Sequence, residues 1–434
     1  MAPVMMDVLE EHLDEATFLW SQWERALVSA ECDLQATTRR EERLLAHLDG
    51  LVVGGESAMS ELLLPGLTTD ESERISASTF ALLAGNGAPA LEKVLQVFDM
   101  GEAVQRTAVG RALELSAKNE LEPVLRRRLA ADDKALQLMA FQVLAFRGEV
   151  PQETRKEWLH HDDAEHVIAA LRDVRPLPRD IVNGLLPQLL VDPRSGVSGA
   201  AIMAGLVCGT RMAWNACRRV AEEGGPGRRQ CLVMLALGGD EQDSEWLVGL
   251  LRQPKLRPDV LWALGFSGQS SVADACLEWM DDPQVAALAG EAFSAITGLK
   301  LEGEYQRVPE ETEALIPLEQ EDLDANLVPP PEASLPIPVR STVEAWWRKA
   351  RKNFERGIRY LRGSRLDTAA LLAALEREPM RRRHVLALEL YIRSRGAHAV
   401  QTRAFMGRQH AELAAARAAR TSFSMGPFAK NFGN

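Results

Sequence analysis

Helix-ending turns recur about every 30 residues along this chain, and this spacing limits the possible folds more than any other feature. Apolar stretches of helical character end near Gly87, Asn119, Gly148, Pro178, Gly209, Gly239, Gly268 and Gly298, at successive intervals of 32, 29, 30, 31, 30, 29 and 30 residues. Each interval holds two apolar-periodic segments of helix length, such as 272–280 and 284–296. Two short helices cannot bury their apolar faces alone, so neighbouring pairs must stack on one another.

The ends of the second helices also repeat in sequence. Four copies of one phrase stand at FALLAGNG (80–87), FQVLAFRG (141–148), LVMLALGG (232–239) and LWALGFSG (261–268). In the turn before the last second helix, Asp282 is expected to cap that helix and Pro283 suits its first position. Asp132-Asp133 and Asp162-Asp163 stand at the matching point of earlier pairs.

No window of the sequence alternates apolar and polar residues between hairpin turns, so strands are not expected. The predicted fold is therefore all-α. It is an α-solenoid of helical-hairpin repeats with a period of about 30, followed by an additional helical C-terminal unit.

Composition divides the chain into four predicted segments. They are an N-terminal helical cap (1–74), the repeat array (75–299), an acidic Pro-rich linker (300–340) and a basic helical C-terminal unit (341–434). In the cap, apolar periodicity predicts helices over 8–28 and 37–52. The C-terminal unit begins with STVEAWWRKARKNFERGIRYLRG, which is expected to be helical.

The two ends of the chain carry opposite charge. Residues 1–339 contain 30 Lys and Arg against 55 Asp and Glu, whereas residues 340–434 contain 20 against 7, giving −25 and +13. The opening MAPVMMDVLEEHLDEA lacks the basic and apolar regions of a secretory signal, and the longest uncharged apolar run, 199–209, is too short to span a bilayer. A cytoplasmic protein without a membrane span is expected.

The repeats resemble HEAT repeats of the short kind seen in phycobilin-lyase-like proteins. The residues that carry the resemblance are the A-L-G-x-x-G phrase at 263–268, the Asp-Asp-Pro turn and AFSAITG at 292–298. It covers about residues 75–299. It implies that the helical hairpins are HEAT-like.

Taken whole, the chain is similar to a conserved, uncharacterised proteobacterial family with HEAT-like centres. The matching residues are EHLDEATFLW (11–20), EERLLAHLDGL (41–51), Trp346-Trp347 followed by RYLRG (359–363), and RRRHVLALEL (381–390). Members of that family often lie near type VI secretion genes. The resemblance therefore implies an accessory, adaptor or immunity-like role, with a secretion component or an effector as protein partner.

The basic C-terminal unit carries the candidate partner-binding residues, because cationic and aromatic side chains are interleaved there. They are Trp346, Trp347, Arg348, Arg351, Arg359, Tyr360, Arg362, Arg381, Arg382 and Arg383. Such a set could grip nucleic acid, but the array is acidic and would repel a duplex. Docking of the basic unit on the acidic array, or binding of an acidic protein, is the favoured interpretation. Trp346, Trp347 and Tyr360 are also expected to belong partly to the core of this unit.

A metal-dependent enzyme is the other alternative. His160, His161, Asp162, Asp163, Glu165 and His166 form the densest set of metal-ligand residue types. HEAT-repeat iron hydroxylases use His-Glu pairs repeated over several units, whereas this chain has one pair in reversed order, and one pair cannot hold two metal centres. The five cysteines have no CxxC spacing and are interpreted as buried thiols. No catalytic residue, metal site or cofactor is therefore predicted, and the favoured function is a non-enzymatic protein-binding scaffold.

Overall fold

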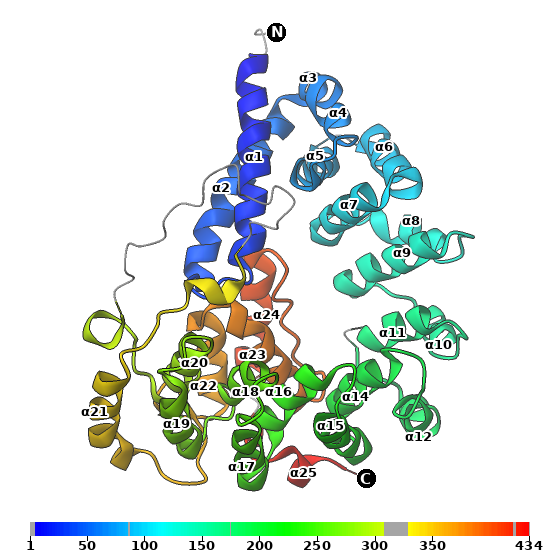
Figure 1. The fold of residues 1–434 in the computed structure, drawn as a ribbon. Coiled ribbons are helices and arrows are strands. Elements are labelled where there is room, and N and C mark those ends of the chain that lie inside the picture. The colour runs from blue at the N-terminus through cyan, green and yellow to red at the C-terminus, as the bar shows by residue number, and fades with distance from the viewer. Residues whose placement is uncertain (1–4, 86, 174, 308–328, 420–421, 434) are drawn as a thin grey trace, which may run out of the picture. The chain divides into compact units, whose positions relative to one another are not determined.

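The computed structural model describes residues 5–85, 87–173, 175–307, 329–419 and 422–433, and it is all-α, as predicted (Figure 1). One short antiparallel pairing, β1 (Tyr360–Leu361) with β2 (Ser364–Arg365), is the sheet found in these described ranges. In the same ranges, no helix combines the length and apolar character needed to cross a membrane.

The chain forms two compact units. Unit 1 consists of Met1–Val28, Cys32–Cys208 and Arg383–Arg420, and unit 2 consists of Ser29–Glu31, Gly209–Arg382 and Thr421–Asn434. The polypeptide passes from unit 2 to unit 1 within α23 (Met380–Arg393). The four segment boundaries drawn from composition stay a prediction.

Unit 1 stacks helical hairpins in chain order. Its inner helices, each packed on the next, are α5 (Ser72–Gly85), α7 (Ala103–Leu115), α9 (Lys134–Arg147), α11 (Ala164–Arg172) and α14 (Val197–Cys208). Outer helices cover this row: α6 (Gly87–Met100), α8 (Leu121–Arg128), α10 (Gln152–Leu159), α12 (Arg179–Gly184) and α13 (Leu186–Leu189). This is the stacking of a solenoid, in which each hairpin buries its apolar face on its neighbours.

The N-terminal end of unit 1 is a longer helical pair. The pair α1 (Met6–Ala26) and α2 (Leu34–Val53) packs on α5, and α3 (Gly55–Ala58), the π-turn η1 (Met59–Leu63) and α4 (Leu64–Gly66) lead into the stack. The C-terminal helix α24 (Met406–Ala418) packs on α2. Unit 1 is therefore completed by residues from near both ends of the chain.

Unit 2 repeats the same plan. Its inner helices are α16 (Arg228–Gly238), α18 (Arg257–Leu264) and α20 (Ala286–Thr297), covered by α15 (Arg211–Glu223), α17 (Glu241–Leu250), α19 (Ser270–Cys276) and the 3-10 turn η2 (Leu277–Trp279). The later elements are η3 (Gly303–Tyr305), η5 (Pro331–Ser334), α21 (Arg340–Ala350), η6 (Arg351–Asn353), the β1–β2 hairpin, α22 (Thr368–Arg377) and α25 (Phe428–Asn431).

Several inner helices begin or end where the sequence predicts. The carboxylates of Asp133 and Asp163 cap α9 and α11 by accepting backbone N–H groups of the first turn, and Gly148 and Gly298 end α9 and α20 in the left-handed conformation. The four copies of the repeated phrase close α5, α9, α16 and α18. The hairpin pattern is thus present, whereas the HEAT-like type of the units stays a prediction.

The predicted cap at Asp282 is wrong by one turn. The helix α20 begins at Ala286. The Asp282 carboxylate instead accepts a hydrogen bond from Gln284 N at 3.0 Å and forms an ion pair with Arg257 at 3.0 Å. Residues 282–285 form a separate turn, because Val285 has φ −137° and ψ 1° and cannot continue a helix.

The helical pattern expected over 341–363, on one or two helices, is wrong beyond α21 (Arg340–Ala350) and the 3-10 turn η6 (Arg351–Asn353). Residues 360–363 are held by backbone hydrogen bonds to the ends of neighbouring helices, from Tyr360 N to Gly268 O, Arg362 N to Ala295 O and Gly363 N to Ile296 O. Arg362 and Gly363 lie at φ 50° and 79°, outside the right-handed helical region. The basic side chains of this stretch are therefore not displayed on one helix.

The described ends of the predicted linker lie side by side. The backbone N–H of Arg307 donates to Ile337 O at 2.8 Å, and Val339 N donates to Tyr305 O at 2.9 Å. Both ends therefore belong to unit 2. The prediction of a Pro-rich acidic coil over 308–328 lies outside the described residues.

Candidate functional sites

The candidate residues on α21 are partly buried. The Trp347 side chain is 3% exposed, and its Nε1 donates to Asp274 Oδ1 at 2.6 Å on α19. Trp346 stacks on Trp347 with ring centroids 6.1 Å apart, and Arg351 forms an ion pair with Asp274 at 3.1 Å. Arg348 is solvent-exposed and pairs only with Glu344 on its own helix. The tryptophan-bearing face of α21 thus packs on the array within unit 2.

Arg359, Tyr360 and Arg362 join the β1 hairpin to the array. The Arg359 guanidinium donates to the carbonyl oxygens of Ser267 and Phe266, in the turn that follows α18. Tyr360 is buried and its hydroxyl accepts the N–H of Glu355. Arg362 pairs with Glu378 and donates to Ser294 Oγ at 2.7 Å.

The three consecutive arginines are all buried. In unit 2, Arg381 pairs with Glu291 at 3.1 Å and Glu332 at 2.9 Å, and its guanidinium lies 4.4 Å from the Trp262 ring centroid. Arg382 is fully buried beside Glu378. In unit 1, Arg383 is also fully buried, and its NH1 donates to Gln409 Oε1 at 2.8 Å.

The candidate set is therefore not gathered on one exposed surface. Within unit 2, Arg359, Arg362, Arg381 and Arg382 contact the array, which agrees with the docking interpretation. Of the ten candidates, Arg348 is the one that the structure leaves largely exposed, at 75% of its side chain. Binding of a partner by the whole set stays a prediction, and it would require these internal contacts to open.

The histidine cluster lies in unit 1 at the start of α11. His166 is buried between the rings of Trp158 and His161, with centroids 4.5 and 4.1 Å away, and its Nε2 is 2.8 Å from Gln137 Oε1. Burial, followed by the nearby His161, lowers the pKa of His166. Asp163 is used as the helix cap and as an ion-pair partner of Lys134, which lowers its pKa. Over the described parts of the chain, no three His, Cys, Asp or Glu side chains come together as a metal site.

Replacing His166 with alanine is expected to lower the free energy of unfolding by about 2 kcal/mol, because it opens a gap between two rings and removes the hydrogen-bond partner of Gln137 Oε1. His160 is exposed, and its Nδ1 lies 2.9 Å from Lys156 O on the same helix end, so the matched H160A variant should change stability by less than about 0.5 kcal/mol. Urea unfolding of both variants checks this. Equal stabilities would contradict a packing role for His166.

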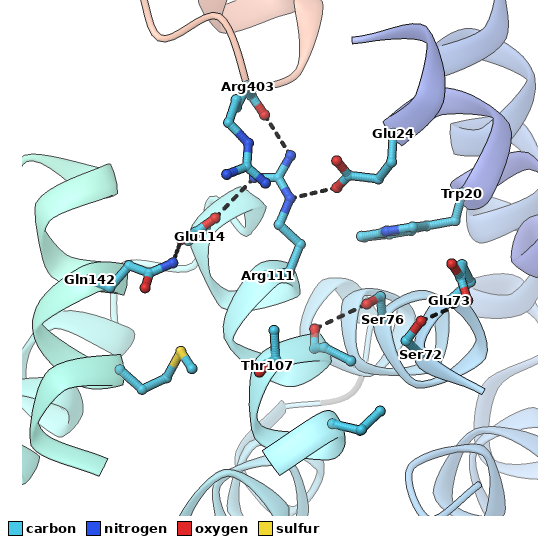
Figure 2. Close-up of a pocket in the computed structure, with 13 residues that line it drawn as sticks. Trp20, Glu24, Ser72, Glu73, Ser76, Thr107, Arg111, Glu114, Gln142 and Arg403 are labelled. Atoms are coloured by element: carbon cyan, nitrogen blue, oxygen red, sulfur yellow. Dashed lines mark hydrogen bonds and ion pairs between the residues drawn. The ribbon is translucent and has the colours of Figure 1, made fainter. Parts of the chain in front are cut away.

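A cavity of about 290 Å³ opens between the inner helices of unit 1 (Figure 2). We call it the Arg111 cavity. Its lining comes from α1, α5, α7, α9 and the loop before α24: Trp20, Glu24, Ser72, Glu73, Ser76, Val104, Thr107, Ala108, Arg111, Glu114, Met139, Gln142 and Arg403. Because successive inner helices stack side by side, each contributes side chains to the same hollow.

Arg111 organises the charged side of this cavity. Its Nε donates to Glu24 Oε1 at 2.6 Å, NH1 to Glu114 Oε2 at 3.0 Å and NH2 to the backbone oxygen of Arg403 at 2.7 Å (Figure 2). Glu114 also accepts from Gln142 at 3.1 Å. The guanidinium thus joins α1, α7 and the segment before α24, and its position is fixed by three directed hydrogen bonds.

Glu73 lies on the opposite side of the Arg111 cavity, at the start of α5. It accepts a hydrogen bond from Ser72 Oγ at 2.7 Å, and none of the described basic side chains forms an ion pair with it. Three carboxylates, of Glu24, Glu73 and Glu114, thus face two guanidiniums, of Arg111 and Arg403. Val104 and Met139 add apolar surface. The cavity therefore suits a cationic group on an aliphatic stem.

The sequence did not single out these residues. Glu24 and Arg111 are 87 positions apart, and Arg111 and Arg403 are 292 apart. One local signal existed, because Arg111 stands in the middle of the apolar segment 108–113, where a charge must find partners. That signal gives the position of a buried charge but not its partners.

Comparison with known proteins shows only distant likeness. No protein-family model matches the chain, and no curated protein matches it. Among solved structures, an engineered protein aligns at 16% identity over 64% of this chain and 87% of that one, with a TM-score of 0.27. Human deoxyhypusine hydroxylase in complex with glycerol aligns at 17% identity over 64% and 97%, with a TM-score of 0.24. Scores this low carry no argument about fold or function.

Proposed function

We propose that this protein is a non-enzymatic, cytoplasmic protein-binding scaffold or adaptor, and that it receives a Lys or Arg side chain of its protein partner in the Arg111 cavity. The observation that supports this most directly is the Glu73 carboxylate, which faces the cavity without a cationic partner. A stack of helical hairpins offers an extended, preformed surface of the kind that binds polypeptides.

The chemistry of the cavity favours binding over catalysis. Three side chains there could act as acids or bases: Glu24 and Glu114 are held by Arg111, and Glu73 accepts a hydrogen bond from Ser72. The hydroxyls of Ser76 and Thr107 donate to the backbone oxygens of Ala108 and Ala103. A partner's ammonium or guanidinium group near Glu73 would complete the charge balance, with its aliphatic stem on Val104 and Met139.

The resemblance of residues 11–20, 41–51, 346–347, 359–363 and 381–390 to the proteobacterial family indicates what the partner is. We infer a type VI secretion component or an effector, bound in an accessory or immunity-like role. No specific observation favours a metal-dependent enzyme or a nucleic-acid-binding protein over this proposal.

The test uses the full chain as bait for a displayed library of random peptides. Recovered peptides should be enriched in Lys and Arg, and Glu73→Gln should weaken their binding about fivefold, as expected for one partly exposed charge pair. Glu71 is exposed and two residues away, so Glu71→Gln is the matched control and should bind normally. Peptides without basic enrichment, or equal binding by E73Q and E71Q, would refute the proposal.

A further inference from the structure

Unit 2 holds a short segment of its own chain in a groove on α15 and α16. Within this segment, residues 422–433, α25 packs on α15 (Figure 1). The rings of Phe428 and Phe432 stack with centroids 5.0 Å apart, and Phe428 meets Trp214 edge to face at 5.6 Å. Phe428 is 1% exposed and Phe432 7% exposed.

The groove is shaped for the Phe428 ring. A Cβ atom on Gly238 would lie 1.9 Å from Cδ2 of Phe428, so only glycine lets the ring reach the α16 backbone. Backbone contacts fix the segment beyond the rings. Arg211 N donates to Gly433 O at 2.9 Å, Gly433 N donates to Gly209 O at 3.2 Å, and Arg211 NH2 donates to Ala429 O at 2.8 Å.

The segment binds its groove as a short peptide ligand would, through a few buried side chains. Phe428, which begins α25, and Phe432, the residue that follows it, are its two buried side chains, whereas Lys430 and Asn431 are exposed. Two apolar anchors on one helical face are typical of helix-in-groove recognition. Among the described residues, no acceptor lies within hydrogen-bond distance of the buried Trp214 Nε1. A different occupant with an acceptor there would satisfy this donor.

We propose that the groove on α15 and α16 is a second docking site, specific for a polypeptide segment that presents Phe-x-x-x-Phe on a helical turn. Residues 427–433 occupy it in the free protein, and a partner's segment of the same pattern takes their place. This site lies in unit 2 and does not depend on the Arg111 cavity of unit 1.

The probe is a labelled peptide with the sequence of residues 422–433, and the protein is the full chain. A Phe428→Ala, Phe432→Ala double variant should release the intramolecular segment and bind the peptide saturably at one site. The unsubstituted chain should bind it at least tenfold more weakly, because its own segment competes at a high effective concentration. A peptide with both phenylalanines replaced by alanine should not bind.

A change on the groove side supplies the control. In the double-variant background, Gly238→Ala should abolish peptide binding, because its methyl group occupies the ring position. Gly249→Ala is the matched change, since a Cβ there meets nothing within 4 Å, and it should leave binding unaltered. Equal binding by both glycine variants would overturn the proposal. So would a double variant that loses its helical circular dichroism and does not regain it with peptide, since the segment would then be core.

Discussion

Replacing Arg382 with alanine should lower the free energy of unfolding by about 3–5 kcal/mol, the range for removing one partner of a buried ion pair. Arg382 is fully buried; its Nε donates to Glu378 Oε2 at 3.0 Å and its NH2 to Gly265 O at 2.8 Å. Burial alone would raise the pKa of Glu378, but Arg362 and Arg382 outweigh it and hold that pKa below its ordinary value. Without Arg382, a buried carboxylate loses one of the two cations that keep it ionised.

Two further variants separate charge from packing. The Arg382 guanidinium lies 4.2 Å from the Phe266 ring centroid, so part of the loss in R382A is lost contact area. Arg382→Met keeps most of that contact but removes the charge, so its free energy of unfolding should fall by nearly as much as that of R382A. Arg348→Ala removes an exposed arginine and should cost less than about 1 kcal/mol. Urea unfolding measures all three, and an R382M variant as stable as the unsubstituted chain would show that packing, not charge, dominates.

The sequence predicted the parts of the fold that local chemistry controls. The helices expected over 8–28 and 37–52 are α1 (Met6–Ala26) and α2 (Leu34–Val53), and their apolar periodicity was sufficient because both bury one continuous face. Asp133 and Asp163 were placed at the right turns because a carboxylate caps the helix that follows it within three residues. The spacing of such turns gave the hairpins of both units.

The local sequence pattern gave a wrong prediction of secondary structure where distant carbonyl oxygens bind the backbone N–H groups. Residues 351–365 have helical spacing, but Tyr360 donates its N–H group to Gly268 O, beyond the end of α18. Arg362 and Gly363 donate theirs to carbonyl oxygens in the last turn of α20. Those acceptors lie 67 to 92 positions earlier in the chain, and no window of neighbouring residues contains them. Hydrogen bonds to distant parts of unit 2 therefore stabilise a non-helical backbone where the local sequence favours a helix.

The local sequence also could not predict the burial of Arg381, Arg382 and Arg383. Three consecutive cations are ordinarily solvated, because burying an unpaired charge is very unfavourable. Here each meets a partner from elsewhere in its own unit, including Glu291 for Arg381 and Gln409 for Arg383. The pairing residues were visible in the sequence, but nothing in it assigned them to one another. The Arg111 cavity escaped prediction for the same reason.

The stability of unit 1 should fall as pH rises from about 4.5 to 7, because of Glu41 on α2. Its carboxylate is 4% exposed and accepts from Trp23 Nε1 at 3.0 Å and from Met406 N at 2.8 and 2.9 Å. Burial raises the pKa of Glu41 from 4.5 to about 7, despite these hydrogen bonds. Below pH 4.5 the group is protonated in both folded and unfolded chains. Between the two pKa values only the unfolded chain releases its proton, so unfolding becomes easier.

The size of this effect follows from the pKa difference, which corresponds to roughly 3 kcal/mol once the pH exceeds 7. Glu41→Gln keeps a neutral side chain at every pH and should abolish this part of the pH dependence. The stability of this variant relative to the unsubstituted chain should therefore increase as pH rises. Glu42 is exposed and adjacent, and its charge is the last of the causes that raise the pKa of Glu41, so Glu42→Gln should preserve most of the slope. Urea unfolding at pH 4.5, 5.5, 6.5 and 7.5 distinguishes them. Parallel curves for E41Q and the unsubstituted chain would mean that the pKa of Glu41 is the same in the folded and unfolded chains, with the donors Trp23 and Met406 offsetting its burial.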